Sequence, residues 1–454
     1  MDGNSYEYGP IIRAPKDQAA WIVWDTLQQE IEELCAQVDI STLGDDIQQQ
    51  WQDAKLAQRI SMLASADATM ATEESRERAQ QLLAALKEVE ANFTTSLVAK
   101  DLDRPRKTRL LKRGEYNLPA GDALQPDVPA VMGGLPEDAP RNRLGLAQWL
   151  TSREHPLVAR VVANQLWQRI FSDGLVRTPE DFGLQGEQPT HPVLLDWLAV
   201  EFQDSGWNRK HMLREMVLSR TFRQDSSWRK DIDDPENRLF SRGPSYRLDA
   251  EVLRDIGLWA SHLLDPHMGG EGIKPYQPGG MWLAMAHPAS NTKKYERDQG
   301  QRLYRRSLYV YWKRTSPHPM MTLFDAPDRE SSCVQRSRTN TSLQSLGLLN
   351  ETQRIEMSRK LAERLIKERA NDEERLDLLF SLLASRNPTP SERVACESLL
   401  ETMRKRYQSQ EKDATELVSV GDANRDPALS PADVAAWTQV AVIVLASDTA
   451  ILLY

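Results

Sequence analysis

The spacing of apolar residues predicts helices along most of the chain. Residues 16–100 contain no proline, and their apolar side chains recur at spacings of three and four, which places them on one face of a helix. A first run consists of Trp21, Trp24, Leu27, Ile31 and Leu34. A second run consists of Leu82, Leu83, Leu86 and Val89. We therefore predict that residues 1–100 form an N-terminal helical hairpin of two long antiparallel helices.

The segment 101–140 has a different composition. It carries the basic run RPRKTRLLKR and then a series of prolines and glycines. Prolines at these spacings cannot continue a helix or occupy a central strand. An extended linker is therefore expected over 101–140, followed by a helical domain over 141–454.

Short amphipathic helices with recognisable first residues are predicted within this domain. Pro156 begins one of them, and Thr190, Asn208 and Asp249 are expected to cap the next three. Further on, Thr389 and Ser430 each precede a proline, as at the start of a helix. The residues between those two helices, 408–429, are expected to form a flexible polar loop. Helices at this density indicate a multi-helix bundle or array.

Two segments break the helical pattern. Residues 266–300 are rich in glycine, proline and aromatic residues, and loops of this length are usually functional or mobile. The run RRSLYVYWKRT that follows is typical of a short strand, so strand is expected mainly around residues 303–315. The predicted fold class is mainly α, with the N-terminal hairpin and a small β element.

Composition narrows the possible functions. The net charge is −9, and residues 16–100 alone carry 15 acidic and 7 basic side chains, so no nucleic-acid partner is expected. The three cysteines are far apart and form no CxxC, so neither a metal site nor a haem attachment can be recognised. The longest apolar stretch, Val434 to Ala446, is too short to span a membrane and predicts a buried helix.

No familiar catalytic motif is present. GxGxxG, GxxxxGK[ST], HExxH, GxSxG and an EF-hand loop are all absent, so whether the chain is an enzyme stays open and no catalytic residue is named. Candidate residues must therefore come from clusters of polar side chains.

The first cluster lies between residues 141 and 191. It consists of Arg143, Asn164, Arg177, Glu180, Asp181 and His191. Arginine and asparagine can hold an anionic or polyhydroxylated ligand, and His191 can transfer a proton near neutral pH. The alternative is structural: Thr178 and Asp181 form a capping box, and Asn164 only links backbone groups.

The second cluster lies between residues 325 and 340. It consists of Asp325, Asp328, Arg329, Arg338 and Asn340. Carboxylates three residues apart can share a metal or divide acid and base roles, whereas ion pairs that only fasten loops show the same pattern. Trp282 and Trp312 occupy loop or strand positions, where a tryptophan can line a ligand surface.

The two clusters suggest one binding cleft. Both are rich in side chains that form charge-assisted hydrogen bonds with oxygen-rich ligands. We expect the two regions to fold against each other with the loop 266–300 at the rim. The cleft would be lined by Arg143, Asn164, Arg177, Asp325, Arg329 and Asn340, with Trp282 or Trp312 as an apolar side.

Several long segments resemble one known family. They include RNRLGLAQWLTSREHPLVARVVANQLWQRIFSDGLVRTPEDFG, DPENRLFSRGPSYRLDAEVLRD, IKPYQPGGMW, YRRSLYVYWKRTSPHPMMTLFDAPDRE and RTNTSLQSLGLLN. These, with RPRKTRLLKRGEY upstream, resemble the planctomycete domain of unknown function 1553. In that family the domain usually follows a cytochrome-c-type domain in a larger exported protein. The resemblance therefore implies a cytochrome-c-type partner, and a glycan-handling or electron-transfer setting.

This chain departs from the family pattern in two respects. It has no CxxCH and no signal-peptide pattern, so no haem or other cofactor is expected, and it looks like the C-terminal module alone. The resemblance implies an exported protein, but it supplies no catalytic residues.

Two functions are compatible with the sequence. One is a non-catalytic ligand-binding or interaction module, accessory to a redox or glycan-handling assembly. The alternative is a carbohydrate-active hydrolase that uses an acidic cleft. Convergence of Glu180, His191, Asp325 and Asp328 in one cleft would favour the hydrolase.

Overall fold

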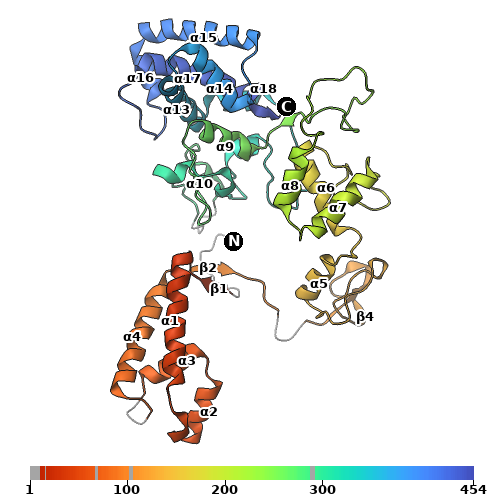
Figure 1. The fold of residues 1–454 in the computed structure, drawn as a ribbon, viewed down its shortest axis with the longest axis vertical. Helices are drawn as coiled ribbons and strands as arrows, with labels where there is room; N and C mark the ends of the chain where they lie inside the picture. Colours follow the sequence, from red (N-terminus) through yellow and green to blue (C-terminus); the bar gives the residue numbers. More distant parts are fainter. Residues whose placement is uncertain (1–10, 16, 67–69, 102–105, 287–291, 454) are drawn as a thin grey trace. The chain divides into compact units, whose positions relative to one another are not determined.

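The described part of the chain is mainly helical. The computed structural model describes residues 11–15, 17–66, 70–101, 106–286 and 292–453. Helix accounts for 52%, and the described residues contain 18 α-helices and three two-stranded antiparallel sheets, so the predicted fold class is confirmed (Figure 1). The chain divides into two compact units, Met1–Leu124 and Gln125–Tyr454.

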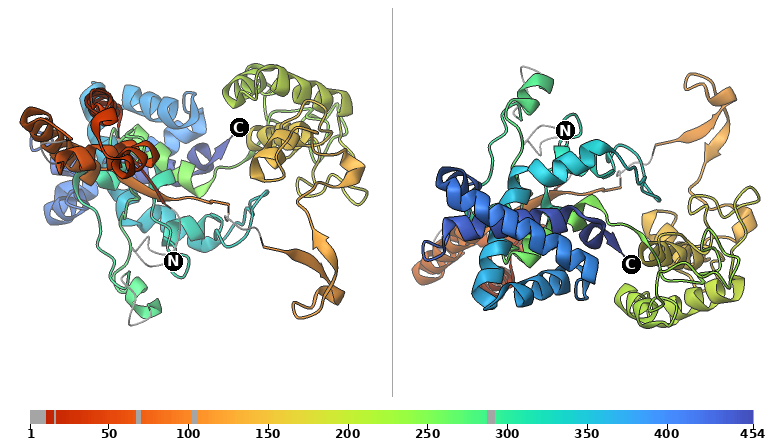
Figure 2. Two further views of the ribbon diagram at one scale, coloured as in Figure 1. Left: turned by 90° about the horizontal axis from the view of Figure 1, so that it is seen from below. Right: turned by 90° about the horizontal axis from the view of Figure 1, so that it is seen from above.

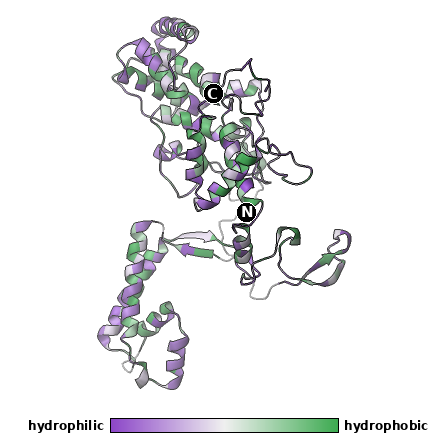
Figure 3. Cartoon of the chain, turned by 45° about the vertical axis from the view of Figure 1, so that its right-hand side comes forward, coloured by the Kyte–Doolittle hydropathy of each residue, from purple (hydrophilic) through white to green (hydrophobic). Residues whose placement is uncertain are grey.

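The first unit is built around two long helices. These helices, α1 (Gln18–Ala36) and α4 (Glu73–Ala91), pack against each other and against α3 (Leu56–Ala64). Each of them carries both hydrophilic and hydrophobic residues (Figure 3). Their apolar sides enclose a core that includes Ile31, Ile60, Leu63 and Leu82. Burial of these side chains, rather than helix propensity, holds the unit together.

Additional elements surround this helix pair. A short helix, α2 (Asp45–Asp53), precedes α3, and β1 (Ile11–Ala14) pairs with β2 (Thr94–Leu97). The segment expected to be an extended linker contains an antiparallel hairpin of β3 (Thr108–Leu111) and β4 (Pro119–Leu124). The described residues of this unit thus contain four α-helices rather than the two expected from the sequence.

The second unit begins with four helices. They are α5 (Arg143–Leu150), α6 (Val158–Phe171), α7 (Pro192–Asp204) and α8 (Arg209–Leu218). Their core includes Trp167, Phe171, Leu198 and Met212. As predicted, Asn208 caps α8, since its Oδ1 accepts the His211 backbone N–H at 3.1 Å. Thr190 does not cap α7, because its hydroxyl donates to the Leu175 carbonyl.

The remaining helices pack around α17. This helix, α17 (Pro431–Ala446), contacts α13 (Thr352–Glu368), α15 (Pro390–Ser409) and α16 (Glu411–Val418) (Figure 1, Figure 2). Because neighbours cover it on several sides, nearly every side chain from Val434 to Leu445 is buried, Trp437 completely. None of the described helices is long and apolar enough to cross a membrane.

The first residues of α15 and α17 test the two caps predicted in this region, Thr389 and Ser430. Thr389 forms the predicted capping box with Glu392, whose pKa the Arg386 guanidinium lowers to about 2. Ser430 makes no side-chain cap, and the Asp433 carboxylate pairs with Arg404 at 2.8 Å. The expected polar loop at 408–429 is wrong in part, since α16 lies within it.

The remaining elements are short or connect the larger helices. They are β5 (Tyr246–Arg247), α9 (Ala250–Ala260), α10 (Met281–Met285), α11 (Pro319–Leu323), α12 (Ser342–Asn350), α14 (Asp372–Ala384), α18 (Asp448–Ile451) and β6 (Leu452–Leu453). β5 pairs with β6 in antiparallel register, so the described end of the chain lies beside the first turn of α9. The predicted cap Asp249 precedes α9 but makes no side-chain cap.

The predicted strand around residues 303–315 is wrong. The segment forms two 3₁₀ helices, Gly300–Tyr304 and Ser307–Tyr309, and single bridges join Asp265 to Arg305 and Ile273 to Val310. Individual side chains of this run bond to different neighbours instead of a partner strand. Tertiary contacts therefore override the local strand propensity.

A buried polar network connects this segment to α13. Glu356 is 0% exposed, and its Oε1 accepts hydrogen bonds from the Tyr304 hydroxyl at 2.9 Å, the Tyr276 hydroxyl at 3.3 Å and the Ala423 backbone N–H at 2.6 Å. Burial and the neighbouring Glu356 raise the pKa of Tyr276 to about 12. Gly421 is required here, because its φ is +90° and a Cβ would lie 2.4 Å from the Glu356 carboxyl group. The network therefore anchors part of the loop 266–300 to the core.

We expect His318 to make the stability of the second unit depend on pH. The side chain is 6% exposed, its Nε2 donates to the Tyr276 carbonyl at 2.7 Å, and burial lowers its pKa to about 4. Between pH 6.5 and 4 the unfolded chain binds a proton at this position and the folded chain does not. The contribution is therefore complete above pH 6.5 and is lost as the pH falls through 4, about 3 kcal/mol in total.

Urea unfolding between pH 4 and 7 measures this effect. The free energy of unfolding should fall less steeply with acid in the variant His318→Gln than in the wild type, because glutamine keeps a donor for the Tyr276 carbonyl without a titrating group. The exposed His267 supplies the control His267→Gln. Equal pH slopes for all three proteins would contradict the assignment.

Candidate functional site

The residues of the first predicted cluster are mostly engaged in local structure. Asn164 is 0% exposed, and its side-chain amide accepts from the Val176 N–H and donates to the Val176 carbonyl, both at 2.9 Å. A side chain with both groups satisfied inside the core cannot line a cleft, so Asn164 is a backbone cross-link. Arg177 pairs with Glu236 at 2.9 Å and with Asp173 at 3.7 Å.

The other members of that cluster are separated. Arg143 is exposed in the first turn of α5. His191 precedes α7, and its Nδ1 lies 3.0 Å from the Thr190 hydroxyl. Asp181 belongs to a turn rather than a capping box, because its backbone carbonyl accepts the Thr178 hydroxyl and its Oδ1 accepts the Gly183 N–H. Glu180, next to it, is exposed.

The second cluster fastens and flanks one loop. Asp325, whose φ is +60°, accepts the Thr339 backbone N–H at 2.8 Å and the Arg247 guanidinium at 2.6 Å. Burial opposes ionisation of Asp325, but these hydrogen bonds outweigh it and hold the pKa of the carboxyl group below its usual value. Because Asp325 ties to Thr339, the ends of the segment 326–338 are held together, as in an Ω-loop. We call this segment the 326–338 loop.

Three arginines hold the 326–338 loop along its length. Arg329 stacks on the Trp312 ring at 4.7 Å, and Arg336 pairs with Glu251 at 2.7 Å and with Asp249 at 3.3 Å. Arg338 lies over the Tyr246 ring at 4.4 Å. Between these anchors, residues 330–333 are exposed.

Two hollows lie along the 326–338 loop. The outer hollow has a volume of about 820 Å³ and is lined by Glu180, Asp325, Ala326, Pro327, Asp328, Ser331, Ser332, Cys333, Val334, Gln335, Arg336 and Ser337. The inner hollow has a volume of about 140 Å³ and is lined by Gln168, Arg169, Ser172, Asp173, Tyr246, Leu248, Asp249, Val252, Val334, Gln335, Arg336 and Arg338. Residues 334–336 line both hollows, so the two hollows adjoin along the loop.

The cleft formed by these hollows differs from the predicted one in its members. Glu180, Asp325 and Asp328 line the outer hollow, and Arg338 lines the inner one. Arg143, Asn164, His191 and the exposed Asn340 line neither. The predicted regions 141–202 and 304–350 do meet, since Arg338 donates to the Ser172 hydroxyl at 2.6 Å.

The two tryptophans are not exposed ligand surfaces in this cleft. Trp282 is 2% exposed, with its ring against those of Tyr295 and Tyr311 and the Lys313 ammonium 4.7 Å away. One face of Trp312 is covered by Arg329. The described residues of the loop 266–300 line neither hollow.

Sequence reasoning missed the segment that completes the inner hollow. Tyr246, Leu248 and Asp249 come from β5 and the residues before α9. Glu251 lies in the same helix start. Burial opposes ionisation of its carboxyl group, but the Arg336 guanidinium outweighs burial and lowers the pKa of Glu251. The signal that could have found them is the run SYRLDAEVLRD, which places a tyrosine and three acidic residues next to a helix start.

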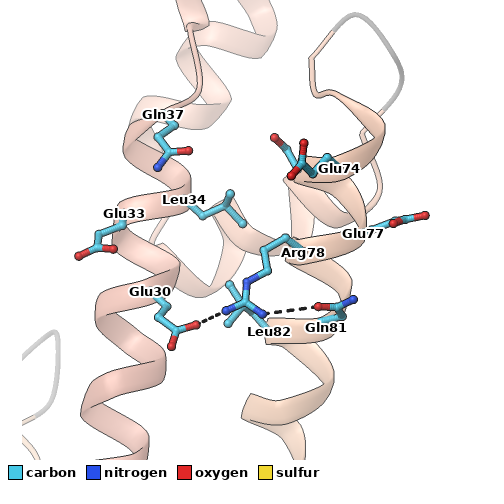
Figure 4. Close-up of a pocket in the computed structure, with 10 residues that line it drawn as sticks. Glu30, Glu33, Leu34, Gln37, Glu74, Glu77, Arg78, Gln81 and Leu82 are labelled. Carbon is cyan, nitrogen blue, oxygen red and sulfur yellow. Dashed lines mark hydrogen bonds and ion pairs between the residues drawn. The ribbon is translucent and has the colours of Figure 1, made fainter.

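A separate hollow in the first unit has a different character. It has a volume of about 660 Å³ between α1 and α4, and Glu30, Glu33, Glu74 and Glu77 line it around Arg78 (Figure 4). Arg78 bonds to Glu30 and lies 3.5 Å from the Gln81 Oε1. Exposed glutamates on two helix surfaces are ordinary for solvated helices. Among the described residues, no group of three or more His, Cys, Asp or Glu side chains could hold a metal ion.

The described part of the chain is thus a mainly α protein with two adjoining hollows beside an arginine-fastened loop. A family profile described as "Protein of unknown function (DUF1553)" matches residues 142–400. The match covers more than half of the chain, so the chain belongs to this family. Both hollows lie within the matched range. No curated protein and no solved structure matches the chain.

Proposed function

We propose that the second unit is a binding module and that its cleft binds a hydroxyl-rich ligand such as a glycan. The observation that carries the proposal is the 326–338 loop, which is tied at its ends by Asp325 and Thr339 and lines both hollows. A polar surface held in place before binding loses little conformational entropy when a ligand arrives. The outer volume of about 820 Å³ is also within the range of small-molecule sites.

The charges of the cleft support a ligand that is not a polyanion. Five carboxylates line the two hollows with three guanidinium groups, and two of those carboxylates, Asp325 and Asp173, pair with Arg247 and Arg177. Positive and negative groups are therefore close to balance. Ionised donors and acceptors in alternation suit sugar hydroxyls, each of which both donates and accepts.

We propose an accessory role on the basis of the family resemblance rather than of the cleft. In the arrangement we propose, the module holds a glycan for a separate catalytic or redox domain. A cytochrome-c-type domain is the partner that the family resemblance suggests, and an exported location goes with it.

A hydrolase is the second candidate, because three carboxylates share the outer hollow. Asp325 is committed to Arg247 and Thr339 with a lowered pKa, so acid and base roles would fall to Glu180 and Asp328. The carboxyl group whose pKa burial raises, Glu351, lines another cavity. Release of reducing ends from a bound glycan, lost in Glu180→Gln, would establish the hydrolase.

A glycan array, run with and without divalent cations, tests the binding proposal. We expect at least one class of glycan to bind. Gln335 is exposed and lines both hollows, so Gln335→Ala should weaken binding roughly three- to tenfold, as for the loss of one hydrogen bond of about 1 kcal/mol. The exposed Gln408 on α15 supplies the control Gln408→Ala. Absence of binding to every glycan would overturn the proposal, and so would equal affinities of both variants and the wild type.

A further inference from the structure

The side-chain amide of Gln168 lines the inner hollow without a protein partner among the described residues. Gln168, in the last turn of α6, is 7% exposed and lines this hollow. Its side chain makes no hydrogen bond to any residue that the structure describes. Its polar atoms are accessible from the hollow, since they are not among the enclosed side-chain atoms of the described residues that lack a partner. A ligand group in the adjoining space of about 140 Å³ would supply the missing partner.

A cation in the same hollow is also left without a counter-charge. Arg336 pairs with Glu251 and Asp249, and Arg169 lies 3.6 Å from Asp249. Arg338 forms no ion pair with any carboxylate of the described residues. Its guanidinium is nevertheless held in place, over the Tyr246 ring at 4.4 Å and by its bond to the Ser172 hydroxyl. Four of its five N–H groups remain available for a ligand.

The end of α6 does not cancel this charge. The last carbonyls of a helix carry about half a negative charge, which disfavours an anion nearby. Two of these carbonyls, of Arg169 and Ile170, accept the Tyr246 hydroxyl at 3.0 and 3.3 Å. The full positive charge of Arg338 exceeds the partial negative charge that remains on the last carbonyls of α6. The hollow therefore stays favourable for an anionic group.

We infer that the inner hollow is a subsite for a carboxylate, so that the module prefers acidic sugars. This inference rests on the proposed glycan-binding function. The ligand carboxylate would accept two parallel hydrogen bonds from the Arg338 guanidinium and one from the Gln168 amide. The outer hollow, which Glu180 and Asp328 line, accepts hydroxyl groups of the neighbouring sugars.

Paired ligands that differ only in charge test the subsite. Calorimetric titration of the full chain with 3′-sialyllactose, which carries one carboxylate, and with its methyl ester compares one sugar chain with and without that charge. We expect the acid to bind at least about tenfold more tightly than the ester, which corresponds to about 1.4 kcal/mol. Arg338→Gln should remove this preference, so that acid and ester bind with equal affinity.

A second arginine controls for general electrostatic attraction. Arg214 is exposed on α8 and lines neither hollow, so Arg214→Gln removes the same charge elsewhere. Retention of the acid preference in this variant supports the inference, and loss equal to that in Arg338→Gln overturns it. Equal affinity of the wild type for acid and ester overturns the subsite alone. Failure to bind these and every arrayed glycan overturns the proposed function as well.

Discussion

Replacing Glu356 with alanine should lower the free energy of unfolding of the second unit by about 4 kcal/mol. The carboxyl group is completely buried and accepts hydrogen bonds from two tyrosine hydroxyls and from the Ala423 N–H. Alanine leaves all three donors inside the protein without an acceptor. Each unsatisfied donor costs about 1–3 kcal/mol, and the removed side chain adds a cavity. Urea unfolding monitored by far-ultraviolet circular dichroism measures the change.

Two further variants show whether the hydrogen bonds cause the loss. Glu356→Gln keeps an acceptor for the three donors and should cost clearly less than alanine. Glu397 is exposed on α15, so Glu397→Ala should change the stability by less than about 0.5 kcal/mol. If Glu356→Ala were as stable as Glu397→Ala, the network would not hold the loop 266–300 to α13.

Replacing Asn164 with alanine should cost about 3 kcal/mol. Both polar groups of this side chain bond to Val176, so alanine leaves a buried N–H and a buried carbonyl unpaired. Gly174 packs so closely against this side chain that a Cβ at that position would lie 2.6 Å from the amide nitrogen of Asn164. Thermal and urea unfolding measure the loss.

Asn340 provides the matched control for this substitution. The sequence analysis expects Asn340, like Asn164, to line the cleft. Asn340 is exposed and makes no hydrogen bond to a described residue. Asn340→Ala should therefore leave stability unchanged within about 0.5 kcal/mol. A nearly wild-type melting temperature for Asn164→Ala would contradict the cross-link and restore Asn164 as a candidate ligand residue.

Local sequence signals predicted the helices but not the segment around 303–315. Apolar periodicity and caps such as Asn208 act within one helix, so they can be recognised without knowing the neighbours. In the segment 303–315 the side chains bond to residues far away in the chain. Tyr304 donates to Glu356, and Arg305 to backbone carbonyls of residues 267–271. Strand propensity cannot anticipate such contacts.

The same limit explains the mixed outcome for the site residues. The sequence does not show whether a given arginine or aspartate pairs inside the protein or faces a ligand. Arg177 and Asp325 prove to be paired, whereas Arg338 has no carboxylate partner among the described residues. The sequence indicated the two regions that meet at the cleft. It gave no sign of Gln168, whose single amide became distinctive only when the structure placed it beside an empty volume.

Hydrogen–deuterium exchange with a bound glycan tests the central claim most directly. A ligand in the cleft reduces local opening, so backbone amides of the segments that line it exchange more slowly. With a glycan from the array at saturation, we predict slower exchange in the peptides covering 326–338 and 168–173. Peptides of α1 and α4 should be unchanged. Protection confined to other segments, with 326–338 exchanging as in the free protein, would contradict the account.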